Sequence, residues 1–115
     1  MSNELLYSAG VTAKAVSTTP LNLLHDTNES FEIPAGQRWR LNVAATTVGI
    51  TVKVYARVSA NATCGLVEIT ALATTVAAGA TATLAGDGEC AQTLKVMGYT
   101  AAATSTVNAS MVVGS

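Results

Sequence analysis

The chain has 115 residues and a formal net charge of −1, and charged residues make up 11% of it. Such a weakly charged chain has no general electrostatic attraction to nucleic acid or to a membrane surface, and its length is that of one domain with a core of its own. Its 21 Ala, 17 Thr and 13 Val residues stand against one Phe and one Trp, and β-branched side chains favour strands over helices.

The N-terminal part of the chain has the weakest pattern. Short strands are predicted at Leu5–Ala9 and Leu21–His25. Residues 1–18 are interpreted as an extended arm that can reach a neighbouring copy. The start, MSNELLYSAGVTAKAV, has no basic segment followed by an apolar one. We therefore expect no secretory signal peptide, and synthesis in the host cytoplasm.

Alternation of apolar and polar side chains is clearest between residues 31 and 58, FEIPAGQRWRLNVAATTVGITVKVYARV. A strand at Ser30–Ile33 enters a PAGQ turn, and two half-buried strands follow. The AATT segment between those two strands is short enough for a hairpin turn, which pairs Leu41 with Ile50 and Trp39 with Val52. We expect this hairpin to be the centre of a sheet, with Trp39 as its largest core side chain.

The predicted hairpin places a row of basic and aromatic side chains on its outer face. We interpret the row either as a solvated sheet face or as a contact face for an acidic protein surface. With its tyrosine it also resembles a nucleic-acid platform, which is the least favoured of the three interpretations. The candidate protein-contact residues are Arg38, Arg40, Lys53, Tyr55 and Arg57.

Further strands are predicted in the C-terminal half, separated by the turns AAGA, AGDGE and TAAATS. They lie at Gly65–Ala71, Thr81–Leu84, Gln92–Tyr99 and Thr106–Val113. The Ala-rich segment LATTVAAGATA leaves room for a short helical turn. In total, about seven to nine short strands predict one all-β domain over residues 1–115, an antiparallel β-sandwich or a jelly roll.

No group of residues has the spacing of a catalytic or metal site. His25 is the only histidine, and the adjacent Asp26 would point to the opposite face of a strand. Asp87 and Glu89 stand in a Gly-rich turn that lacks the further oxygen ligands of a calcium loop. We predict no enzyme activity, no cofactor and no bound metal. Residues 69–86 and 96–115 are uncharged but contain many polar residues, so no membrane span is predicted.

Cys64 and Cys90 each precede a predicted strand. If the two residues met, a disulfide would stabilise the fold by roughly 3.5 kcal/mol on a chain-entropy estimate. In a protein that is not exported, reduced thiols acting as small core residues are the favoured alternative.

Several segments, in order, resemble small β-sandwich proteins of tailed bacteriophage virions. They are SFEIPAGQRWRLNVAATT, GITVKVYARV, TTVAAGATATL and TLKVMGYTAAATSTVNASMVVGS, which together span about residues 30–115. In such proteins a strand enters a Pro-Ala-Gly turn, a long hairpin follows, and a Val/Asn-rich strand ends near a terminal Gly.

The resemblance implies a non-enzymatic structural protein of the virion, above all a capsid decoration or cement protein. Its partners would be copies of itself, often in a trimer, and other virion proteins of the capsid or tail. The alternative is a tail-fibre or spike module that binds a host receptor or glycan, which would need solvent-facing aromatic residues. With Trp39 inward, only Tyr7, Tyr55 and Tyr99 are left for such a surface.

Overall fold

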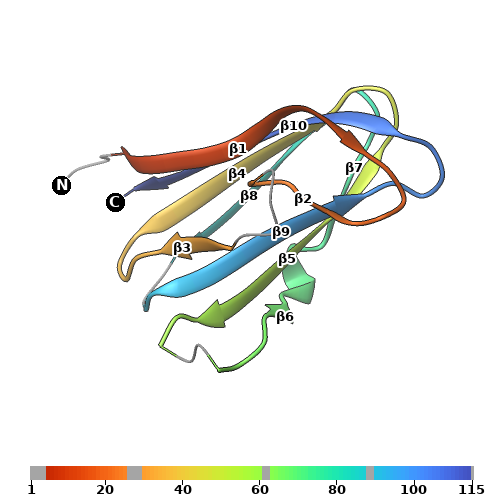
Figure 1. The fold of residues 1–115 in the computed structure, drawn as a ribbon. Coiled ribbons are helices and arrows are strands. Elements are labelled where there is room, and N and C mark those ends of the chain that lie inside the picture. The colour runs from red at the N-terminus through yellow and green to blue at the C-terminus, as the bar shows by residue number, and fades with distance from the viewer. Residues whose placement is uncertain (1–4, 26–29, 61–62, 88–89, 115) are drawn as a thin grey trace.

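The computed structural model describes residues 5–25, 30–60, 63–87 and 90–114, and it folds them into two antiparallel sheets that face each other (Figure 1). Within these ranges no helix is long and apolar enough to cross a membrane. The strands are β1 (Leu5–Val16), β2 (Leu21–Asn22), β3 (Phe31–Ile33), β4 (Arg38–Ala45), β5 (Ile50–Val58), β6 (Val67–Glu68), β7 (Thr74–Val76), β8 (Thr81–Asp87), β9 (Gln92–Tyr99) and β10 (Ser105–Gly114), with a 3-10 helix η1 at Thr70–Leu72.

Sheet A has the order β1-β10-β4-β8. Sheet B has the order β2-β9-β5-β6, with β3 also pairing with β9 and β7 with β5. Because β2 and β3 share one edge and β6 and β7 share another, the ten described strands occupy eight positions. Along the chain these positions are β1, β2 with β3, β4, β5, β6 with β7, β8, β9 and β10. The first position pairs with the eighth, the second with the seventh, the third with the sixth and the fourth with the fifth. This is the order of a jelly roll. The predicted all-β sandwich is confirmed, and this order selects the jelly roll.

The core lies between the two sheets and uses the inward side chains of each strand. Trp39 is 3% exposed and Leu41 is fully buried on β4, as the alternation predicts. On β5, Val52 and Val54 are 1% and 0% exposed. Polar side chains therefore occupy the outer faces of both sheets.

The predicted hairpin between residues 38–43 and 48–58 is wrong. β4 pairs with β10 and β8 in sheet A, whereas β5 pairs with β9, β6 and β7 in sheet B. The chain crosses between the sheets through residues 46–49. There the Val48 N–H donates to Ser105 Oγ at 3.2 Å, and the Ser105 hydroxyl donates to the Val48 carbonyl at 2.6 Å. Strands that face each other across a core show the same alternation as paired strands, and AATT lacks the Gly or Asn that a tight hairpin turn favours.

The N-terminal segment continues beyond the predicted Leu5–Ala9 strand. β1 pairs with β10 of the same chain through residue 16, with register shifts that include one between Val11 and Lys14. At this bulge Ala13 adopts φ 51°, and its N–H donates to Asn108 Oδ1 at 2.7 Å. Extension of residues 1–18 onto a neighbouring copy stays a prediction.

Gly86 on β8 lies against the indole of Trp39, and a Cβ at this position would come within 2.5 Å of Nε1. We expect Gly86→Ala to lower the free energy of unfolding by about 1–3 kcal/mol, because the buried ring would have to move. Urea denaturation followed by the emission of Trp39, the only Trp, measures the effect. Ala85→Val, at the exposed neighbouring residue, should change stability by less than about 0.5 kcal/mol. Equal stability of both variants would contradict the tight contact.

Candidate functional site

The five residues of the predicted contact row lie on two different sheets. Arg38 and Arg40 are on the outer face of sheet A, on β4. Lys53, Tyr55 and Arg57 are on the outer face of sheet B, on β5. Because the two outer faces point away from each other, the five side chains do not form one row. A contact role for each of the two subsets stays a prediction.

Lys53 has two charged or aromatic partners on the outer face of sheet B. Its Nζ lies 3.8 Å from Glu68 Oε1 and 5.8 Å from the centre of the Tyr99 ring. The Glu68 carboxylate, and after it Tyr99, raise the pKa of Lys53 above its ordinary value of 10.5. An ion pair and a cation–π contact thus hold this ammonium group over the sheet.

The neighbouring strand β9 adds residues that the sequence analysis did not group with the row. In the register of the two strands, Lys53 faces Met97 and Tyr55 faces Lys95. Tyr99 lies four residues beyond Lys95, about 13 Å along the strand. Alternation within residues 92–99 indicates which side chains point outward, but not that β9 lies beside β5. We call this group the Lys53 cluster: Lys53, Tyr55, Arg57, Lys95, Met97 and Tyr99.

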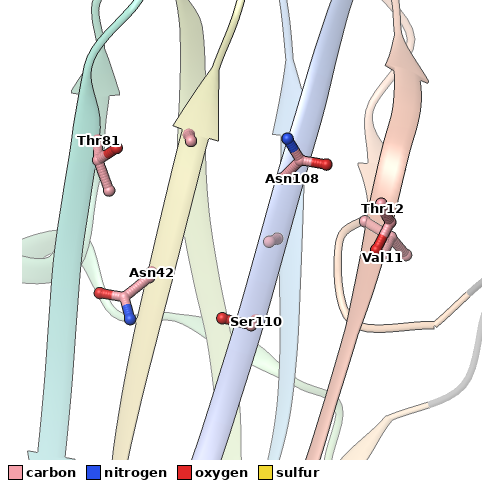
Figure 2. Close-up of a pocket in the computed structure, with 8 residues that line it drawn as sticks. Val11, Thr12, Asn42, Thr81, Asn108 and Ser110 are labelled. Atoms are coloured by element: carbon pink, nitrogen blue, oxygen red, sulfur yellow. The ribbon is translucent and has the colours of Figure 1, made fainter.

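The outer face of sheet A carries a shallow hollow of about 470 Å³ (Figure 2). Asn42 on β4 and Asn108 and Ser110 on β10 line it, and Thr81 on β8 stands at one side. The Thr83 hydroxyl donates to Asn42 Oδ1 at 2.8 Å. None of the described residues that line the hollow is charged. Its small, uncharged side chains suit contact with a flat surface better than they suit acid–base chemistry.

The candidate catalytic residues do not assemble into a site within the described residues. His25 follows β2, is half-buried, and its ring centre lies 5.8 Å from that of Phe31. Asp26, Glu89 and the side chain of Asp87 lie outside the part that the structure describes. In that part no group of three or more His, Cys, Asp or Glu side chains is placed to hold a metal ion.

Both cysteines are free and exposed, so their expected role as small core residues is wrong. The carbonyl of Cys64 accepts a hydrogen bond from Arg57 Nη1 at 2.9 Å. Ala91, which follows Cys90, accepts one from the Ser59 N–H at 2.9 Å. Both thiols therefore lie near the end of sheet B where β5 ends and β9 begins.

No protein-family model and no curated protein matches this chain. Among solved structures, one described as "Bacillus endospore appendages form a novel family of disulfide-linked pili" has 16% identity and a TM-score of 0.57, covering 100% of this chain and 91% of that one. Two structures of infectious bursal disease virus are also similar. The Gx strain has 9% identity and a TM-score of 0.45, covering 96% of this chain and 30% of that one. The Gt strain has 10% identity and a TM-score of 0.41, covering 96% and 32%. At these identities the first likeness shows a shared fold.

The ion pair of Lys53 predicts a pH-dependent contribution to stability. Because the pKa of Lys53 is raised in the folded state, the pairing stabilises the fold below the ordinary pKa of 10.5 and is lost as the pH rises through the raised pKa. We expect Lys53→Met to melt slightly below wild type at neutral pH, with a difference that vanishes in strong alkali. Circular dichroism melts over this pH range measure it, with Lys95→Met as the matched control on the same face. A difference that does not depend on pH would contradict the pairing.

Proposed function

We propose that this chain is a non-enzymatic structural protein of a virion, a capsid decoration protein that associates with copies of itself and docks on other virion proteins. The observation that carries the proposal is the likeness in fold over the whole chain to a structure described as a pilus. The likeness covers 91% of that chain, and the appendages it forms are described as disulfide-linked pili. The jelly roll is also an architecture of viral capsid domains.

The surface of the sandwich supports a role in assembly. Charged residues make up 11% of the chain, fewer than the roughly 25% of an ordinary domain. The hollow of sheet A is flanked by Arg38 and Arg40 further along β4. The uncharged hollow beside Arg40 fits a partner surface that has few charges over the hollow and an acidic group beside Arg40, since docking there would desolvate few charges without a partner.

Self-association is the first part of the proposal to test. Sedimentation of the purified protein should give a mass that is a multiple of 11.6 kDa and rises with concentration. Because both thiols are exposed and the pili are described as disulfide-linked, the measurement is made with and without reductant, and with a Cys64→Ser, Cys90→Ser double variant. An assembly lost only with reductant or in the variant is held by disulfides. A monomer under every condition would contradict self-association.

Docking on a capsid is the second part to test. The protein should bind undecorated capsids saturably, in a fixed ratio to capsid subunits. Arg40→Glu on sheet A should weaken this binding, because it reverses a charge beside the uncharged hollow. Lys95→Glu, the matched reversal on sheet B, should not. The reverse pattern would assign docking to the Lys53 cluster, and no binding by wild type would contradict the decoration role.

One observation favours a second function, a tail-fibre or spike module that binds a host receptor or glycan. Tyr55 and Tyr99 share the outer face of sheet B with Lys53, so two of the three tyrosines lie on one face, four residues apart along the paired strands. A Tyr55→Ala, Tyr99→Ala double variant should then lose binding to host cells and keep binding to capsids. Unchanged cell binding by this variant would argue against that module.

A further inference from the structure

A jelly roll leaves four sheet edges, and three of them are interrupted in the part of this chain that the structure describes. Beyond β9 the edge of sheet B consists of β2, with two residues, and β3, with three. Beyond β5 it consists of β6, with two residues, and β7, with three. The β1 edge of sheet A has register shifts, the positive φ of Ala13, and Lys14. Short strands, bulges and lysines are the features by which proteins prevent edge-to-edge pairing.

The fourth edge, β8, is longer and has neither a bulge nor a lysine, and its one charged residue, Asp87, is the last residue of the strand. Its seven residues, TATLAGD, pair with β4 in unbroken register from Thr81 to Asp87. They include no Pro, Lys or Arg. Among the described residues β8 pairs with β4 alone and ends sheet A, as its place beside β4 in Figure 1 shows. An edge that is regular and unprotected in this way is a template for another strand.

The ladder at the start of β8 shows which backbone groups point to the free edge. The Ala45 N–H donates to the Ala80 carbonyl at 3.2 Å, and the Gly79 N–H donates to the Ala45 carbonyl at 2.8 Å. Hydrogen-bonded and non-hydrogen-bonded pairs alternate along an antiparallel ladder. Backbone groups of every second residue therefore point away from β4: Thr81, Thr83, Ala85 and Asp87.

We propose that β8 pairs antiparallel with β8 of a second copy of this chain, about a twofold axis at Leu84, and so joins two four-stranded sheets. This inference rests on the proposed self-association and names its contact. The occupant is a second copy because the strand is complementary to itself: Leu84 meets Leu84 of the second copy, Thr83 meets Ala85, and Ala82 meets Gly86. Each of these pairs has both members on the same face of the sheet.

The side chains of β8 fit this contact. Leu84 and Ala82 are only partly buried and pack against the core at its edge, so the second copy would remove more of their apolar surface from water. Thr83 and Ala85 are exposed and small, and leave the neighbouring strand room to approach. The interface is isologous, which closes at two copies.

Proline at residue 85 provides the sharpest test. Ala85→Pro removes an N–H that points to the free edge and leaves the ladder with β4 in place, and proline is tolerated at such edge positions. Ala85→Val keeps the N–H and is the matched control. We expect Ala85→Pro to weaken association by about thirtyfold, the effect of losing one hydrogen bond from each copy, and Ala85→Val to leave it unchanged. Sedimentation measures association, and circular dichroism checks the fold.

Hydrogen exchange of the wild-type protein gives a second readout that needs no variant. In the associated state the amides of Thr83 and Ala85 should exchange more slowly than in dilute protein. If wild type associates, but Ala85→Pro associates equally well or these amides are not protected, the β8 contact is wrong while self-association stands. If wild type is monomeric at every concentration, the proposed self-association fails as well.

Discussion

The closed core between the two sheets is the constraint on which the rest of this structure depends. The chain has few large side chains, so its core is formed by Val, Leu, Ile and Ala on nearly every inward position, with Trp39 as the largest member. Trp39 fits only because Gly86 opposite it on β8 has no side chain. Because apolar side chains fill the inward positions, polar and charged side chains lie mainly on the two outer faces and at the sheet edges. Function is therefore to be sought on the surfaces of the sandwich.

The sequence predicts the strands better than it predicts their partners. β9 has the predicted bounds, and the PAGQ and AAGA turns form with Gly36 and Gly79 at φ 80° and 76°, where an L side chain is disfavoured. Each of these features depends on local chemistry. The partners of β4 and β5 do not, because facing strands and paired strands have the same alternation. Alternation alone therefore predicts which side chains point inward, but it does not predict to which sheet a strand belongs or with which strands it pairs.

Other differences come from single polar side chains. The predicted strand Leu21–His25 stops at Asn22, whose Oδ1 accepts the N–H groups of Leu24 and His25 and bends the chain into a turn. Similarly, β1 is bulged where Asn108 accepts the Ala13 N–H across the sheet. The Asn22 bonds are local and typical of an Asx turn. The Asn108 bond forms only because the tertiary structure places β10 beside β1, which the sequence does not reveal. The candidate contact residues follow the same rule. Their outward direction was predictable, but their division between two faces depends on the crossing at residues 46–49.

The β8 edge also distinguishes between the kinds of assembly that this fold can build. The proposed isologous contact would occupy β8, the one unprotected edge among the described strands, so growth along the sheet would stop at two copies. A polymer such as a pilus requires a heterologous contact as well. The interrupted edges of sheet B and the bulged β1 make it unfavourable to form such a contact by strand pairing. Further assembly must then use an outer face, either the hollow of sheet A or the Lys53 cluster. The proposed pairing by one edge and docking by one face would suit a protein that decorates a surface which another protein has already built.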